Sequence, residues 1–417
     1  MTPDDLREVE EQQALILARV AERPLVESAT VPVPAALGRT LRAPLRALVD
    51  IPVFDNSGMD GFAVRFEDVA DAAPGRPARL RVVADLPAGT SLDPALAPGE
   101  AARIMTGSPV PSAADAVVPF EDTAGGLGDS LSEIAVERAP RAVGAHIRRR
   151  AEDSAAGDAL LPAGVELGAL QLAAAAAAGV FEVVVSRHPR VAVVSTGSEL
   201  VPPGSPLERG QIPESNSQLL AGLVAQAGAE VVLRTSVPDD GDGPLRAVAE
   251  ATALGADVVV FSGGVSAGAY EPVKMMLAAS MEFTKIRMQP GKPQGFGVTD
   301  AGVLLFGLPG NPVSAAVSFE VFVRPALLAL QGRSQLHRPL LRLPAASAWR
   351  TPPGRRQYLP AAIDRSDPAR WTVRPATGGG SGSHLAGGLA RAEAYAVVGA
   401  DVDAVAAGDL VDVMLIS

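Results

Sequence analysis

Five short clusters of small, polar and charged residues in the second half of the chain each follow a run of hydrophobic residues. The clusters are STGSEL (195–200), VPDDGD (237–242), SGGVSAGAYE (262–271), QPGKP (289–293) and GLPGNP (307–312). Their glycines and serines can expose backbone N–H groups, which bind phosphate and other oxyanions. Because the clusters contain neither GxxxxGK[ST] nor GxGxxG, an ordinary P-loop and a dinucleotide-binding fold are both disfavoured.

The same clusters carry charged side chains that suit a substrate with phosphate or oxyanion groups. Lys292 could meet an oxyanion as a point charge, although a lysine in a turn can equally face solvent. The carboxylates are Glu199, Asp239, Asp240 and Glu271. Beside a phosphate they would repel it unless a hard cation such as Mg²⁺ lay between. For Asp239 and Asp240 the alternative is capping of the helix that begins near Pro244.

A second polar cluster, FDNSGMDGF (54–62), lies far from the others in the sequence. Its polar residues, which include Asp55, Asn56, Ser57 and Asp60, could form a turn with Asx-type capping or part of a site. The histidines are scattered without the spacing of metal ligands, and no Ser/His/Asp triad is indicated.

Strands and helices alternate from about residue 187 to residue 331. Strands are predicted at RVAVVSTG, EVVLRTSV, ADVVVFSGG, FTKIRMQPGKP and GVLLFGLPG. Helices are predicted at NSQLLAGLVAQAG, at PLRAVAEATALG and near 272–280, and helix N-termini are expected after Ser266 and Asn311. This alternation is typical of a parallel, doubly wound sheet. Ligands of such sheets bind at the carboxyl ends of the strands, so we expect the five clusters to meet there.

The rest of the chain has a different pattern. Residues 4–21 are predicted to form an amphipathic helix. Residues 61–143 and 332–417 are predicted as short strands between Pro/Gly turns, the latter forming a small β-barrel or sandwich. Between them, 144–186 contains a basic strand, HIRRRAED, and a helix that should end near Gly179.

Composition limits the class of protein. A chain of 417 residues predicts two to four domains, and its lack of cysteine excludes a disulfide framework or a thiolate metal site. The net charge of −11 disfavours binding to nucleic acid or anionic membranes. No apolar run reaches the ~20 residues of a membrane helix, and the acidic N-terminus lacks a signal core, so a soluble cytoplasmic protein is expected.

These motifs, in this order, resemble those of the molybdopterin molybdenumtransferase family, the MoeA and gephyrin E-domain proteins. The matching stretches are DNSGMDGFAV, RIMTGSPVPSAADAVV, RRRAEDSAAGDALLPAG, VVSTGSELV, SNSQLL, SGGVSAGAYEPVK, PGKPQGFG and GLPGNPVSA. The stretches TGGGSGSHLAGGLARAEAYAVV and AGDLVDV resemble the last domain of the family. The likeness therefore covers nearly the whole chain.

The resemblance implies an α/β multidomain protein with four domains in an elongated homodimer. Domain I would be discontinuous, formed by residues 1–60 and 144–186, with a β-rich domain II at 61–143 inserted into it. Residues 187–331 would form the MogA-like, molybdopterin-binding α/β domain III. Residues 332–417 would form the C-terminal β-barrel, domain IV.

The resemblance also implies an activity. The family inserts molybdate into the dithiolene of adenylylated molybdopterin, with Mg²⁺ and release of AMP. Its upstream partner is a molybdopterin adenylyltransferase, and molybdoenzymes or their chaperones lie downstream. The alternatives are a molybdopterin adenylyltransferase, which the sheet domain alone resembles, and a gephyrin-like scaffold.

Site residues follow from the motif positions. The implied catalytic residues are Asp60, Asp239 and Glu271, and Mg²⁺ would be held by Glu199, Asp239 and Glu271. Asp60 would reach the site from domain I or from the partner subunit. The implied substrate-binding residues are Thr106, Asp153, Ser195, Gly197, Glu199, Ser262, Gly263, Gly264, Ser266, Lys292, Pro309, Gly310, Asn311 and Pro312.

Three positions depart from the family pattern. Many relatives carry Asp where this chain has Ser198, and Asp where it has Glu271. Many also carry Lys where this chain has Gln289, so one of two expected lysines is replaced by an uncharged side chain.

Overall fold

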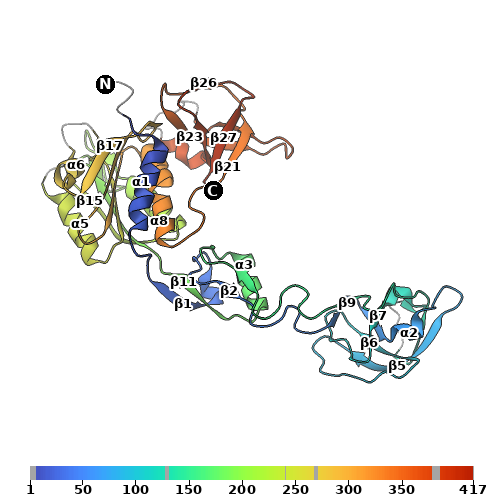
Figure 1. Ribbon diagram of the computed structural model, residues 1–417. Coiled ribbons are helices and arrows are strands. Elements are labelled where there is room, and N and C mark those ends of the chain that lie inside the picture. The colour runs from blue at the N-terminus through green and yellow to red at the C-terminus, as the bar shows by residue number, and fades with distance from the viewer. Residues whose placement is uncertain (1–5, 127–130, 240, 267–270, 378–385, 417) are drawn as a thin grey trace.

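The computed structural model describes residues 6–126, 131–239, 241–266, 271–377 and 386–416. Asp240, considered above as a carboxylate of the second cluster, lies outside the described residues. The molecule is elongated, with the sheet domain and the C-terminal lobe at one end and a β-rich distal lobe at the other (Figure 1). A narrow connecting lobe lies between them.

A six-stranded sheet forms the centre of the α/β domain, in the order β15-β12-β16-β20-β19-β17. The first four strands run parallel: β15 (Glu230–Val237), β12 (Arg190–Thr196), β16 (Val258–Ser262) and β20 (Leu304–Leu308). The predicted α/β fold with a doubly wound sheet is thereby confirmed.

The other edge of the sheet differs from the all-parallel prediction. β19 (Pro293–Val298) pairs antiparallel with β20, and β17 (Met281–Lys285) pairs antiparallel with β19. The segment FTKIRMQPGKP is not one strand, because after Lys285 the chain leaves this sheet. Glycines obscured β19 in the sequence: a Cβ at Gly297 would overlap the carbonyl oxygen of Ser280, the residue just before the adjoining strand β17, so a side chain is excluded there.

Helices cover both faces of the sheet. One face packs against α4 (Asn216–Gln226) and the helix that runs through α7 (Pro312–Ser318) and α8 (Arg324–Leu330). The other face packs against α5 (Gly243–Ala253) and α6 (Pro272–Leu277). In β12 the side chains alternate between these two cores, as the two-residue period of a strand requires.

Among the described residues, one helix is long and apolar enough to cross a membrane by length and composition. It runs from Pro312 to Leu330, and 89% of its most apolar window is buried inside the protein.

The N-terminal helix α1 (Val9–Ala21) packs against α8. Its buried residues Val9, Ile16 and Val20 belong to the core of the sheet domain. It was assigned with residues 1–60 to the elongated domain, but in the structure its apolar stripe is covered by α8 and the π-helical turn before it.

The connecting lobe is built from two antiparallel strand pairs and a short helix. The pairs are β1 (Ser28–Pro32) with β11 (Glu182–Ser186) and β2 (Leu45–Arg46) with β10 (Ala159–Leu161). The helix α3 (Ala169–Ala177) is followed by Gly179, which has the positive φ expected of it.

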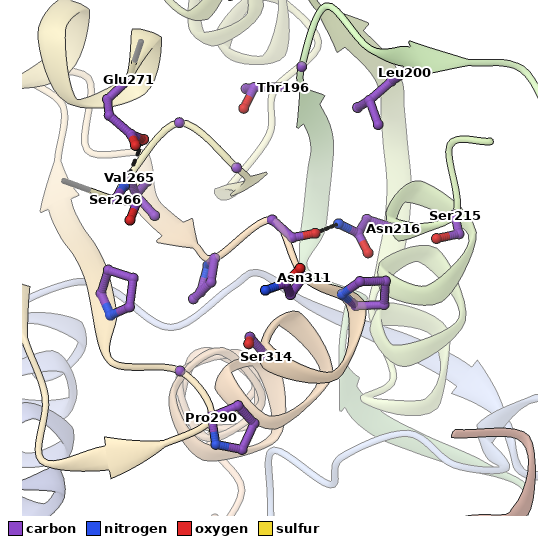
Figure 2. Close-up of a pocket in the computed structure, with 18 of the residues that line it drawn as sticks. Thr196, Leu200, Ser215, Asn216, Val265, Ser266, Glu271, Pro290, Asn311 and Ser314 are labelled. Carbon is purple, nitrogen blue, oxygen red and sulfur yellow. Dashed lines mark hydrogen bonds between the residues drawn. The ribbon is translucent and has the colours of Figure 1, made fainter. Parts of the chain in front are cut away.

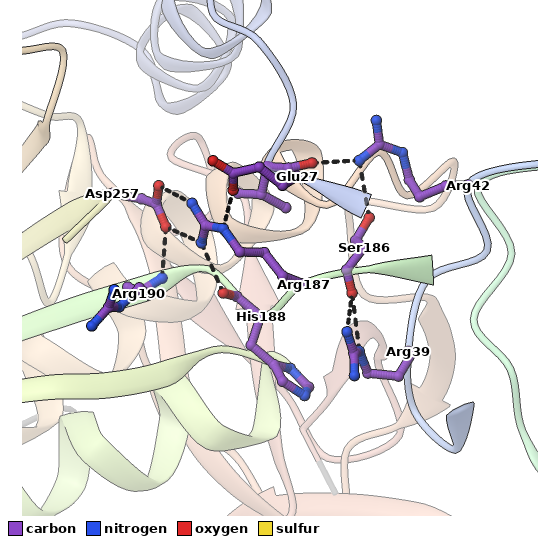
Figure 3. A network of polar contacts seen from close by, with 9 residues as sticks. Glu27, Arg39, Arg42, Ser186, Arg187, His188, Arg190 and Asp257 are labelled. Atoms are coloured by element: carbon purple, nitrogen blue, oxygen red, sulfur yellow. Dashed lines mark hydrogen bonds and ion pairs between the residues drawn. The ribbon is translucent and has the colours of Figure 1, made fainter. Parts of the chain in front are cut away.

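A polar network joins the connecting lobe to the sheet domain (Figure 3). Arg187 donates from both terminal nitrogens to the Asp257 carboxylate, at 2.8 and 2.9 Å, and also pairs with Glu27. Arg39 donates to the carbonyl oxygen of Ser186 at 2.6 Å. The bidentate pair gives this junction a defined geometry.

The distal lobe is a five-stranded sheet in the order β7-β4-β6-β5-β8. Its strands are β7 (Ala116–Pro119), β4 (Gly61–Val64), β6 (Glu100–Ile104), β5 (Ala78–Leu86) and β8 (Glu133–Val136). The basic segment HIRRRAED contains only a two-residue strand, β9 (Ile147–Arg148), which pairs with β3 (Asn56–Ser57). Ile147 packs on the core of this lobe, so the lobe extends beyond the expected 61–143 at both ends.

The C-terminal lobe is a second six-stranded sheet. It contains β21 (Leu340–Pro344), β23 (Arg356–Asp364), β24 (Thr372–Pro375), β25 (Ala394–Val398) and β27 (Leu410–Leu415). A two-stranded sheet, β22 (Trp349–Arg350) with β26 (Ala404–Val405), lies beside it. The sixth strand is β18 (Met288–Gln289), which comes from the sheet domain and pairs with β23. This shared strand ties the two lobes together.

Candidate active site

All five clusters contribute to one cavity at the edge of the six-stranded sheet. Its volume is about 620 Å³. Figure 2 shows side chains from several loops and from the start of α4 and α7 pointing into it. The predicted site residues that line it are Gly197, Glu199, Asp239, Gly263, Gly264, Ser266, Glu271, Lys292, Pro309, Gly310, Asn311 and Pro312.

Two predicted substrate-binding serines do not line the cavity. Ser195 is 0% exposed, and its Oγ donates to Glu214 Oε1 at 2.8 Å. Ser262 is also buried at the end of its strand. Both residues lie within strands, where alternate side chains point into the cores, so neither side chain faces the cavity in this structure.

The loop QPGKP reaches the cavity for a different reason from the one predicted. It was expected to follow a parallel strand, but it precedes β19. Because β19 runs antiparallel to β20, its first residue lies at the same edge as the carboxyl ends of the parallel strands. The carbonyl oxygen of Lys292 accepts from the Ile286 backbone N–H at 2.7 Å, which closes this loop.

A hydrogen bond joins the two described ends of the loop after β16. Glu271 Oε2 accepts from the Ser266 backbone N–H at 2.7 Å. The next described helix, α6, begins at Pro272 with Glu271 as its N-cap. The helix N-terminus expected directly after Ser266 falls on residues 267–270, which lie outside the described residues. By contrast, α7 begins at Pro312, directly after Asn311 as predicted.

Ser198 and Asp239 join the loops that follow β12 and β15. The Ser198 backbone N–H donates to Asp239 Oδ2 at 3.1 Å, and the Asp239 backbone N–H donates to Ser198 Oγ at 3.0 Å. The helix α5 takes Asp242 as its N-cap, so Asp239 does not serve the capping role that was its alternative.

Gly263 lies directly against the backbone of Thr196. Its φ is +96°, and a Cβ there would lie 2.7 Å from the carbonyl oxygen of Thr196. A Cβ on Gly310 would lie 3.4 Å from the α-carbon of Gly263. A larger residue is therefore excluded by both conformation and space, and the loop backbone remains open to a ligand.

The cavity is also lined by Glu214, Asn216 and Arg355, which the sequence did not indicate as site residues. Glu214 directly precedes the motif SNSQLL, and Asn216 is its second residue. Asn216 Nδ2 donates to the Gly310 carbonyl oxygen at 2.6 Å. Arg355 comes from the C-terminal lobe, and its Nη1 donates to Gln289 Oε1 at 2.6 Å. Nothing in the spacing of the motifs indicates Arg355.

The cavity contains charges of both signs. Its carboxylates are Glu199, Glu214, Asp239 and Glu271, and its cations are Lys292 and Arg355. Among the described residues, no group of three or more His, Cys, Asp or Glu side chains is placed to hold a metal ion. Mg²⁺ commonly binds through one or two carboxylates, water and substrate phosphates, and this set of oxygen donors fits that mode.

Asp60 and Thr106 lie together in the distal lobe. Asp60 Oδ1 accepts from the Thr106 backbone N–H at 2.6 Å and from Thr106 Oγ1 at 2.7 Å. These hydrogen bonds hold the pKa of Asp60 below its usual value. Asp153 lies on the segment that joins this lobe to the connecting lobe, where its backbone N–H donates to the carbonyl oxygen of Ile51. Within one chain none of these three residues lines the cavity, and the distal lobe lies at the far end of the molecule (Figure 1).

Comparison with known families accounts for most of the chain. Residues 7–179 match the MoeA N-terminal region (domain I and II), 192–329 match the probable molybdopterin binding domain, and 342–416 match the MoeA C-terminal region (domain IV).

Individual relatives agree with these matches. The chain is 43% identical to molybdopterin molybdenumtransferase 2 of Mycobacterium tuberculosis over 412 residues, which is 97% of this chain and 98% of the relative. It is 40% identical to the molybdopterin molybdenumtransferase of a Nostoc species, over 73% of this chain and 70% of that protein. A crystal structure of the molybdopterin biosynthesis MoeA protein of Pyrococcus horikoshii OT3 superposes with a TM-score of 0.83 and 27% identity, covering 99% of this chain and 100% of that one.

Proposed function

Since the chain belongs to the molybdopterin molybdenumtransferase family, we propose that it transfers molybdenum from molybdate to adenylylated molybdopterin, with Mg²⁺-dependent release of AMP. The chain is a transferase of molybdenum cofactor biosynthesis that acts by molybdate insertion. The proposal adds the adenylylated substrate, the metal and the leaving group. The observation that carries these additions is the cavity, in which glycine-rich loops, carboxylates and two cations face one another.

The substrate's chemistry accounts for the residue types. A phosphoanhydride needs backbone N–H donors, which the loop at Gly263 and Gly264 and the start of α7 can supply. Molybdate is a second oxyanion, and Lys292 and Arg355 are suited to bind it. The sulfur ligands of molybdenum come from the dithiolene of the substrate, so a chain without cysteine can carry out the reaction.

The carboxylates would bind the metal. One or two of Glu199, Asp239 and Glu271 would hold Mg²⁺ together with phosphate oxygens and water, since the three do not form a metal site by themselves. When bound, Mg²⁺ offsets negative charge on the phosphates as the anhydride opens. Ser198 keeps the Asp239 loop in place, and Glu271 holds its own loop through Ser266.

The function is tested by incubating the protein with adenylylated molybdopterin, molybdate and Mg²⁺. Release of AMP that requires both molybdate and Mg²⁺ supports the proposal. Consumption of ATP with free molybdopterin would instead indicate an adenylyltransferase. If the folded protein carries out neither reaction with fresh substrate, the scaffold alternative is favoured.

We also propose that the protein works as a homodimer in the cytoplasm, between an adenylylating enzyme upstream and molybdoenzymes or their chaperones downstream. A face of α3 supports the dimer. Leu170 is 81% exposed, and the exposed alanines 173, 174 and 177 continue the same helical stripe. Phe181, just beyond the helix, is 72% exposed. An apolar stripe of this kind marks an interface.

Replacing Leu170 by glutamate is expected to shift the protein from dimer to monomer, because a charge would be buried in the apolar interface. Sedimentation equilibrium measures the change in mass. The matched control is Leu245→Glu, which changes an exposed leucine of α5. This variant should have the same assembly mass as the wild-type protein. A Leu170→Glu protein that keeps the dimer mass would place the interface elsewhere.

A further inference from the structure

A contact between two lobes closes one side of the cavity. Gln289 is the last residue of β18, and Arg355 directly precedes β23. These two strands pair in parallel, with Met288 opposite Arg356 and Gln289 opposite Gln357. Arg355 Nη1 donates to Gln289 Oε1 at 2.6 Å, and both residues line the cavity together with Lys292. The guanidinium of the C-terminal lobe is thus brought to a site built on another domain.

The chemistry of Gln289 suits it to hold a cation without neutralising it. Its amide oxygen accepts a hydrogen bond but carries no charge. A glutamate there would form an ion pair with Arg355 and compete with an anionic ligand, and a lysine would repel the guanidinium. A guanidinium has five N–H donors, and the contact with Gln289 uses one of them.

The loop that carries Gln289 is itself well anchored. The Ile286 backbone N–H donates to the carbonyl oxygen of Lys292, which fixes the spacing between β18 and Lys292. Gln294 Nε2 donates to the Gly291 carbonyl oxygen at 2.6 Å and to Ser318 Oγ at 2.7 Å, which ties the loop to α7. Gln289 is therefore a fixed acceptor, and a long, flexible arginine bound to it loses freedom before a ligand arrives.

We propose that Gln289 is a positioning residue that holds Arg355 for oxyanion binding, so that the two cations of the molybdate subsite come from different lobes. The identification of the oxyanion as molybdate rests on the proposed function. Gln289 itself acts through Arg355 and is not assigned contact with the substrate.

The test is a double-mutant cycle with Gln289→Ala and Arg355→Ala. Gln289→Ala is expected to raise the KM for molybdate about tenfold, the effect of losing one charge-assisted hydrogen bond that orders the arginine, with a smaller effect on kcat. Arg355→Ala should raise this KM further. Because Gln289 acts through Arg355, Gln289→Ala should add nothing in the Arg355→Ala background. Gln289→Glu should impair molybdate binding more than Gln289→Ala does.

Calorimetric titration of each variant with molybdate gives the same comparison without turnover, so the inference can be judged even if no AMP is released. Thermal unfolding checks that each variant is folded, and Gln226→Ala, an exposed glutamine of α4 outside the cavity, is the matched control. Unchanged molybdate affinity in Gln289→Ala, or effects of the two substitutions that simply add, would overturn the positioning role. Failure of the wild-type protein to release AMP would instead count against the proposed function.

Discussion

Replacing Asp60 by alanine is expected to reduce AMP release at least about a hundredfold, the loss typical of a removed proton-transfer group, while the fold stays intact. The Thr106 contacts lower the pKa of Asp60, so the carboxylate is ionised at neutral pH and can orient molybdate or accept a proton. The rate of AMP release under saturating Mg²⁺ measures the effect. Asp71→Ala is a matched control, because Asp71 is an exposed carboxylate of the same lobe outside the motif. Near-normal turnover of Asp60→Ala would refute the role.

Mixed dimers test where Asp60 acts. Asp60 lies in the distal lobe of its own chain, away from the cavity, so we propose that it completes the cavity of the partner subunit. Mixing Asp60→Ala with Lys292→Ala chains would then restore about a quarter of the wild-type rate, since half the dimers would be mixed and each would have one intact site of two. Mixed dimers that form but remain inactive would show that both residues serve the same chain's site.

Replacing Asp239 by asparagine is expected to slow AMP release about a hundredfold and to raise the Mg²⁺ concentration needed for half-maximal rate. Asparagine can still accept from the Ser198 backbone N–H, so the contact between the two loops is kept while the charge is lost. The measurement is the rate of AMP release as a function of Mg²⁺ concentration.

A carboxylate close by in the sequence provides the control. Asp242→Asn changes the N-cap residue of α5, which pairs with Arg246 and does not line the cavity, and should leave the Mg²⁺ dependence unchanged. If Asp239→Asn had the wild-type rate and Mg²⁺ dependence, Asp239 would not hold the metal.

Local patterns were sufficient to predict the parallel part of the sheet domain. Hydrophobic runs that end in Gly/Ser clusters indicated where each parallel strand stops, and parallel strands place their carboxyl ends at one edge. The differences between the prediction and the structure have local causes. Ser195 and Ser262 belong to the buried ends of strands, and the glycines of β19 obscured an antiparallel strand.

The site likewise contains some residues that local sequence predicts and others that only contacts between lobes place. The backbone loops and their own side chains, such as Glu199 and Glu271, follow from short stretches of sequence, since chain connectivity alone carries them to the edge of the sheet. Lys292 also lies in such a loop, but it reaches the edge because β19 runs antiparallel to β20. Arg355 depends on the pairing of β18 with β23, and the placing of α1 depends on its contact with α8. Such contacts join residues distant in sequence, and their geometry comes from packing between lobes, which no local pattern of residues encodes.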